Sequence, residues 1–270
     1  MTTRSEFSLT VEVVPPAGPD ADPLLAALLA MSPLPFDSFS VATNPVARPR
    51  MSALAFSALV QQRTGKPATL HVTTRDHNRL SLQGLLWGAR ALGIRDVLVA
   101  TGDYVALGDA AHTTAVRDLD VYELVRLARQ ADLHTGVVLD PRPESNRLDY
   151  EVRRLEQKVA AGAQFVVTQP VFDQAAAQTL YEATRHVGIP VILGILPLLS
   201  ARHARFLHDK VAGIAVPEAV RQRMERAADP QVEGVANARE TLALAHEWFG
   251  GACLMPPFSQ FETVASILGA

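Results

Sequence analysis

The stretch LHVTTRDHNRLSLQ, residues 70–83, holds the pattern that decides the fold. Leu70 and Val72 alternate with other residues, as in a β-strand with one apolar face. Polar residues follow from Thr73, and from Leu80 the apolar spacing changes to that of a helix. The stretch therefore predicts a short strand that ends in a polar loop and leads directly into a helix.

The same unit recurs along the chain. Short runs rich in Val, Ile, Leu and Phe, each bounded by turn residues, predict eight strands at 7–14, 36–43, 68–74, 96–101, 135–140, 164–169, 190–196 and 251–258. Segments with helical spacing lie between them, among them 51–63, 80–92, 118–131, 148–161 and 173–187. Side chains suited to N-caps stand at the starts of these helices, namely Ser52, Asn78, Asp118, Asn146 and Asp173.

Regular alternation of strands and helices predicts parallel strands joined by right-handed crossovers. Eight such units in 270 residues close most naturally into a (β/α)8 barrel, a single domain over 1–270. A doubly wound open sheet is the alternative, but no G-x-G-x-x-G motif opens the first helix. The segment 197–250 is longer than one crossover requires, so we expect two or three extra helices before the last strand.

Composition limits the classes of function. Charged residues make up 20% of the chain and hydrophobic residues 48%, with a net charge of −3 at pH 7. This balance argues against a disordered chain and against a nucleic-acid-binding surface, and it favours a small-molecule ligand. The single cysteine, Cys253, excludes an intramolecular disulfide, and no apolar run is long enough to span a membrane. We therefore expect a cytoplasmic protein without membrane contact.

The active site of such a barrel is built from the loops that follow the strands. Glu12 lies within the apolar run of the first strand, where partial burial would raise its pKa and suit it to general-acid catalysis. An ion pair with an arginine such as Arg75 is the alternative. Asp103 follows Gly102 at the fourth strand end, where a flat ligand can approach the backbone and the carboxylate can bind a polarised ring. A simple turn aspartate is the alternative there.

Two further strand residues are candidates. The amide of Gln169, at the sixth strand end, can donate and accept hydrogen bonds at the edge of a pterin or flavin, or can bind strand-end backbone. His71 is expected on the strand face opposite Leu70, where a core role and a site role are both open. No second histidine or carboxylate at metal-ligand spacing accompanies it, so we predict no metal site.

Several segments, taken together, resemble the methylenetetrahydrofolate reductase family over nearly the whole chain. They are VEVVPP (11–16), TNPVARPRMS (43–52), HVTTRDHN (71–78), LGIRDVLVATGD (92–103), LEQKVAAGAQFVVTQPVFD (155–173) and GILPLLS (194–200). Their order and spacing make the resemblance specific. The forms at 43–52 and 71–78 look closest to the branch in which the reductase is attached to, or works beside, a homocysteine methyltransferase module.

The resemblance implies a (β/α)8 barrel carrying FAD, which takes a hydride from NADH or NADPH and passes it to 5,10-methylenetetrahydrofolate to make 5-methyltetrahydrofolate. It implies that Glu12 is the general acid toward the pterin. Asp103 would act beside the flavin and also bind the pterin, and Gln169 would contact the folate.

The same resemblance implies a cofactor site. His71, Gly102 and Lys158 match positions that line the FAD site in the family. We assign Asn44, Thr73 and Arg75 to its rim from their position alone. The sequence departs from the family pattern at one position next to Lys158, where Gln157 replaces the basic residue that the family often has.

Two other functions remain open. The chain could be a folate- or pterin-binding subunit that serves a methyltransferase partner without independent reductase activity. It could also be a barrel reductase with a different hydride carrier or a different one-carbon pterin. We expect the chain to form a homo-oligomer, and a methyltransferase subunit could be a further partner.

Overall fold

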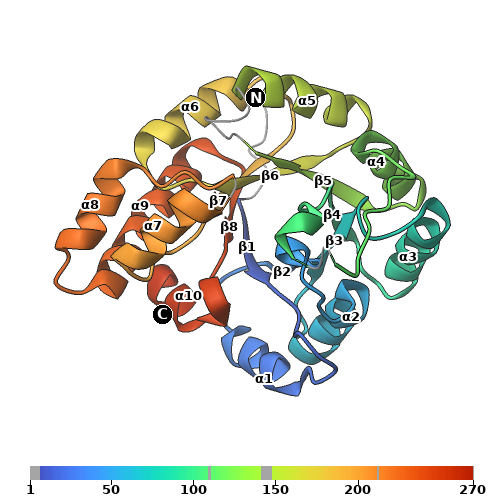
Figure 1. Ribbon diagram of the computed structural model, residues 1–270, viewed down its shortest axis with the longest axis horizontal. Coiled ribbons are helices and arrows are strands. Elements are labelled where there is room, and N and C mark those ends of the chain that lie inside the picture. Colours follow the sequence, from blue (N-terminus) through green and yellow to red (C-terminus); the bar gives the residue numbers. More distant parts are fainter. Residues whose placement is uncertain (1–6, 109–110, 141–147, 212, 270) are drawn as a thin grey trace.

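The computed structural model describes residues 7–108, 111–140, 148–211 and 213–269, and in it eight parallel strands form a closed barrel (Figure 1). The strands lie side by side in sequence order and the last pairs with the first. They are β1 (Ser8–Val13), β2 (Ser38–Val41), β3 (Ala68–Thr73), β4 (Asp96–Ala100), β5 (His134–Leu139), β6 (Phe165–Pro170), β7 (Val191–Ile195) and β8 (Gly251–Leu254). The predicted (β/α)8 barrel is confirmed.

Helices surround the barrel (Figure 1). One helix follows each of the first six strands: α1 (Asp22–Met31), α2 (Ala53–Thr64), α3 (Arg79–Ala91), α4 (Val121–Gln130), α5 (Leu148–Ala160) and α6 (Gln174–Thr184). The extra helices predicted within 197–250 are α7 (Ala201–Lys210), α8 (Glu218–Arg226) and α9 (Pro230–Trp248), and α10 (Glu262–Leu268) follows β8. None of the helices in the described segments has the length and apolar character needed to cross a bilayer.

Short 3-10 turns follow three of the strands at their carboxyl ends. They are η1 (Pro45–Ala47) after β2, η2 (Val105–Leu107) after β4 and η3 (Pro257–Ser259) after β8. The eighth strand is therefore shorter than the predicted 251–258, because the prolines at 256 and 257 cannot donate strand hydrogen bonds.

Three predicted helix caps are confirmed. Ser52, Asn78 and Asp173 each accept a hydrogen bond from a backbone N–H in the first turn of the helix that follows. Asn146 lies outside the described residues. Each cap satisfies a backbone N–H that has no partner within the first turn of its helix.

The predicted cap of α4 is wrong. Asp120 caps the helix rather than Asp118, and it forms a capping box with Glu123, in which each side chain accepts from the other's backbone N–H. Asp118 instead accepts a hydrogen bond from the Arg79 N–H at 3.1 Å and links the start of α3 to this loop. The glutamate three residues after Asp120 is the feature that decides between the two aspartates.

Alternation along the strands produces two separate packing regions. Side chains such as Val11, Phe39 and Leu70 face outward and pack against the helices in one large core. A smaller apolar cluster, built on Leu98, Val167, Ile192 and Cys253, fills the inside of the barrel. These inner residues come from β4, β6, β7 and β8, whereas the inward positions of β1–β3 carry Thr10, Glu12, Ser40, Thr69 and His71. The interior is therefore apolar on one side and polar on the other.

Two glycine substitutions, one in α9 and a control in α3, test how closely α9 packs against the loop after β7. A Cβ on Gly234 would lie 1.7 Å from the Leu198 carbonyl oxygen, whereas a Cβ on Gly84 in α3 would meet nothing within 4 Å. We expect Gly234→Ala to destabilise the fold by about 2–4 kcal/mol, because helix and loop must separate. Gly84→Ala should stabilise it by about 0.5–1 kcal/mol through helix propensity alone. Urea unfolding measures both, and equal effects would contradict the close approach.

Candidate active site

The residues singled out by the sequence gather at one end of the barrel. Glu12 stands near the end of β1, Thr73 ends β3, and Gln169 is near the end of β6. Because all eight strands run parallel, their carboxyl ends meet at the same face. The remaining candidates at this face are Asn44 after β2, His71 in β3, Arg75 after β3, and Gly102 and Asp103 after β4. Lys158 comes from α5.

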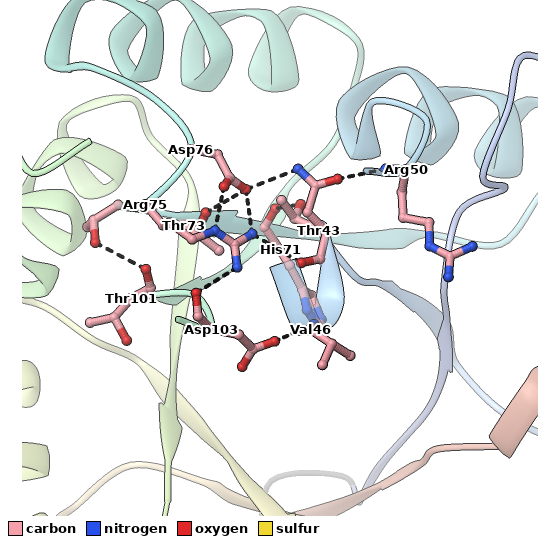
Figure 2. A network of polar contacts seen from close by, with 11 residues as sticks. Thr43, Val46, Arg50, His71, Thr73, Arg75, Asp76, Thr101 and Asp103 are labelled. Carbon is pink, nitrogen blue, oxygen red and sulfur yellow. Dashed lines mark hydrogen bonds and ion pairs between the residues drawn. The ribbon is translucent and has the colours of Figure 1, made fainter. Parts of the chain in front are cut away.

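A largely buried ion pair lies among the loops after β2, β3 and β4. Arg75 is only 6% exposed, and its guanidinium binds the carboxylate of Asp76 through two nitrogens, at 2.5 and 2.9 Å. The same guanidinium donates to the Asp103 carbonyl at 3.0 Å and to the Asn44 carbonyl at 3.1 Å (Figure 2). One side chain thus ties together the loops after β2, β3 and β4.

Asp76 is held as an anion by its neighbours. Burial by itself would raise its pKa, but hydrogen bonds from Arg75, Asn44 and Thr73 and the charge of Arg75 outweigh burial and lower the pKa. Thr73 donates its hydroxyl at 3.1 Å and Asn44 its amide at 3.1 Å (Figure 2). Arg75 is therefore the partner of Asp76 and not of Glu12, so the alternative ion pair between Glu12 and Arg75 is wrong.

Gly102 lets the β4 loop lie directly on this pair. It has φ +84°, and a Cβ there would lie 3.0 Å from Cβ of Arg75 and 3.2 Å from Cβ of Thr73. A side chain at this position would be strained and crowded. We expected a ligand to approach the backbone at Gly102. On one side of the turn, the side chains of Arg75 and Thr73 already occupy that space.

Glu12 and Asp103 interact electrostatically across the mouth of the barrel. Burial and the negative charge of Asp103 raise the pKa of Glu12 to about 7. Asp103 itself is exposed, and its carboxylate accepts the Val46 N–H at 2.6 Å (Figure 2). Glu12 is consequently protonated in a large fraction of molecules near neutral pH.

Val46 was not predicted, although it orients Asp103. It has φ +55°, a left-handed conformation that β-branched residues rarely adopt, and Asn44 and Ala47 share positive φ values. A Cβ on Gly108 would lie 2.2 Å from the Ala47 carbonyl oxygen, so η2 packs closely on η1. Nothing in the residue type of Val46 indicates this role, because the bonding group is its backbone N–H.

His71 faces the barrel interior as predicted. Its Nε2 lies 2.7 Å from the Ser40 hydroxyl, and burial lowers the pKa of His71 to about 4, so the ring is neutral. Ser40 and Thr10 also hydrogen-bond the thiol of Cys253, whose pKa is raised to about 12 by burial and by the charge of Glu12. Cys253 was not predicted as a site residue, although its inward position in β8 follows from strand alternation.

Lys158 lies in the interface between α5 and β5. It is 5% exposed, and its ammonium donates to the Val138 carbonyl at 2.7 Å. Burial and the charge of Arg154 lower the pKa of Lys158 to about 8, while Glu151 and Asp140 act in the opposite direction. Gln157, the departure from the family pattern, accepts a hydrogen bond from the Tyr122 hydroxyl at 2.9 Å.

Within the described residues, no group of three histidine, cysteine or carboxylate side chains is arranged to hold a metal ion. What the site offers is a carboxyl group with a pKa near 7, a second carboxylate and a half-buried amide at Gln169. These groups suit proton transfer and recognition of a polar heterocycle. Lys158 is not brought together with these groups, because its ammonium lies between α5 and β5.

Comparison with known proteins identifies the family. The family model described as methylenetetrahydrofolate reductase matches residues 1–249. The chain belongs to this family. The resemblance noted in the segments from 11–16 to 194–200 is thereby confirmed.

Curated members of the methylenetetrahydrofolate reductase family are distant relatives. A protein of Caenorhabditis elegans named probable methylenetetrahydrofolate reductase (NADPH) is 25% identical over 178 residues, which are 64% of this chain and 27% of that protein. The 5,10-methylenetetrahydrofolate reductase of Salmonella typhimurium is 26% identical over 160 residues, 58% of this chain and 53% of that protein. The chain thus matches only about a quarter to a half of the length of these relatives.

A solved structure has the same architecture. An uncharacterized protein from Clostridium thermocellum, described as binding two copies of 5-methyl-5,6,7,8-tetrahydrofolic acid, superimposes with a TM-score of 0.71 at 16% identity. The match covers 98% of this chain and 94% of that one. At this identity the likeness shows the fold that this member of the methylenetetrahydrofolate reductase family shares with it.

The buried ion pair predicts a pH-dependent stability. Asp76→Asn should destabilise the protein by about 2–4 kcal/mol at pH 7, because it leaves Arg75 buried without a counter-charge. The pKa of Asp76 is lowered in the folded protein, so its contribution is present above the ordinary aspartate pKa and is lost as pH falls through the folded value. The difference from the parent protein should therefore shrink below about pH 4.

Urea unfolding at several pH values measures this difference. Asp22→Asn is the matched control, since it breaks the exposed Arg63–Asp22 pair and should change stability by less than about 0.5 kcal/mol. A large Asp76→Asn effect that stayed constant into acid would show that the ion pair is not its source.

Asp103→Asn should lower the pKa of Glu12, because it removes the negative charge that disfavours ionisation of Glu12. The pKa should remain above the ordinary glutamate value, since burial is the larger cause. The pKa of Glu12 can be measured by following the infrared band of its protonated carboxyl group against pH. Loss of the band in Glu12→Gln assigns it to Glu12, and Asp118→Asn, at an exposed aspartate, is the control. An unchanged midpoint would disprove the coupling.

Proposed function

We propose that this chain is a flavin-dependent reductase that converts 5,10-methylenetetrahydrofolate to 5-methyltetrahydrofolate with NADH or NADPH. The observation that carries the proposal is the pKa of Glu12, which burial and Asp103 raise to about 7. A carboxyl group with a pKa near the working pH is the best general acid, because it is both substantially protonated and acidic enough to donate. Family membership supports the reaction class.

Glu12 would donate its proton to N10, the bridge nitrogen outside the pterin ring. The bond between N10 and the methylene carbon would then break and leave an iminium carbon on the pterin N5, where hydride addition gives the 5-methyl product. The anionic carboxylate of Asp103 would stabilise the positive charge that develops there. Val46 holds Asp103 in place through its N–H, and Arg75 fixes the carbonyl of the same residue. The amide of Gln169 would hydrogen-bond the edge of the pterin.

The residues present fit FAD, which when bound supplies hydride transfer between the nicotinamide and the folate. Gly102 lets the loop after β4 lie directly on Thr73 and Arg75, and neutral His71 lies on the neighbouring strand. Lys158 is bonded to the Val138 carbonyl between α5 and β5, so it would serve a phosphate only if that group reached its ammonium, where the negative charge would offset the burial that lowers its pKa to about 8. Arg75 and Asn44 would act by fixing the rim of the site through their contacts with Asp76.

The proposed acid has a direct test. Glu12→Gln should leave flavin reduction by the nicotinamide intact and slow reduction of the folate by more than about a hundredfold, because the amide cannot donate the proton. In the parent protein the folate step should slow as pH rises above about 7, where Glu12 ionises. Rapid-mixing absorbance of each half-reaction separates the two steps. Near-normal folate reduction by the variant would remove Glu12 from the mechanism.

An alternative is a folate-binding subunit that serves a methyltransferase partner and has no reductase activity of its own. The folate ligand described for the Clostridium thermocellum structure is the reason to retain it. Titration with FAD distinguishes the two: a bound flavin band that NADH or NADPH bleaches and the methylene folate restores supports the reductase. Calorimetric folate binding without any flavin binding supports the subunit.

A further inference from the structure

The outer face of α3 carries large apolar side chains in solvent. Leu80 is 84% exposed and Trp87 is 61% exposed. Gly84 and Ala91 are also exposed, and these four residues recur at the spacing of one helix face. The opposite face of α3, with Leu82, Leu86 and Ala89, is buried in the core. An uncharged stripe therefore runs along the outside of a helix whose inner face is already packed.

The order of sizes along this stripe is large, small, large, small. A Cβ on Gly84 would meet nothing within 4 Å, so the helix has an open notch there. Gly88 differs, because the side chain of Leu54 from α2 lies 3.5 Å from the place of its Cβ. The notch at Gly84 faces outward, and the side chains of Leu80 and Trp87 stand on either side of it.

Such a stripe is complementary to itself. When two copies of α3 pair antiparallel about a two-fold axis midway between residues 84 and 87, Trp87 of one copy faces Gly84 of the other. In the same register Leu80 faces Ala91. Every large residue then meets a small one, as close packing at an interface requires. A parallel pairing would place Trp87 against Trp87 and leave the glycine notches empty.

The charged residues of α3 are compatible with the antiparallel register. The described α3 has two arginines at its ends, Arg79 and Arg90, and its sequence contains no acidic residue. In the antiparallel pair Arg79 faces Leu92 and Arg90 faces Ser81, so the cations do not oppose one another. Arg90 is moreover bound to Asp132 at 2.8 Å on its own chain. An isologous dimer places no like charges in contact along this helix.

We propose that the outer face of α3 is a homodimer interface, formed by antiparallel packing of Leu80, Gly84, Trp87 and Ala91 against the same residues of a second copy. The interface is independent of the proposed reductase activity. A 13-residue helix is about 20 Å long, so this face alone buries less than the roughly 800 Å² per partner of a standard interface. The dimer is accordingly a weak one that depends on protein concentration.

Sedimentation velocity over a range of protein concentrations tests the interface. Trp87→Ala and Gly84→Leu should each weaken dimerisation at least tenfold, the first by removing the large residue and the second by filling the notch. The exchanged double variant Gly84→Trp with Trp87→Gly should restore it, because the two positions face each other. Val232→Asp, which places a charge at an exposed apolar site on α9, should leave the dimer unchanged.

Circular dichroism and thermal unfolding verify that each variant is folded before its mass is interpreted. Dimerisation of the parent, loss in both single variants and recovery in the exchanged variant would establish the interface. A parent protein that stays monomeric at about 100 μM would overturn it. A dimer that persists in both single variants, or that the exchange fails to restore, would place the contact on another face.

Discussion

The active face depends on the ion pair between Arg75 and Asp76. Two charges are removed from water there, which is costly unless every donor and acceptor is satisfied. The guanidinium meets this condition by binding Asp76 and the carbonyls of Asn44 and Asp103. Because these groups come from three successive loops, the energetic need to satisfy one buried cation also fixes the relative positions of the loops. The positions of the loops at the mouth of the barrel therefore depend on the ion pair between Arg75 and Asp76.

The same loops store backbone strain. Asn44, Val46 and Ala47 have positive φ values, and each such residue costs about 1–3 kcal/mol when it is not glycine. The strain persists because Asn44 is bonded on three sides and the Val46 N–H is bound by Asp103. The carboxylate of Asp103 is thus oriented before any ligand arrives. A ligand that uses it would not have to order the loop first.

The strands, most helix starts and the gathering of polar candidates at the strand ends follow from the sequence, because alternation and strand-end polarity are local signals. Glu12 is an example: one acidic residue in an apolar run already indicates a raised pKa. Other features have no local signal. The pairing of Arg75 with its neighbour Asp76 rather than with Glu12 depends on which way the loop turns. The contribution of Val46 is a backbone N–H, and the choice of Asp120 over Asp118 depends on Glu123.

The uneven interior of the barrel explains why Glu12 has the properties of an acid. Strands β4 and β6–β8 fill the interior with Leu98, Val167, Ile192 and Cys253, which exclude water from one side of Glu12. On the other side, the hydroxyl of Ser40 is occupied by neutral His71 and by the Cys253 thiol, and among the described residues no cation lowers the pKa of Glu12. The charge that acts on Glu12 within the described part of the chain is that of Asp103, and it is negative. Desolvation and repulsion therefore act in the same direction, and a single glutamate acquires a pKa near neutrality.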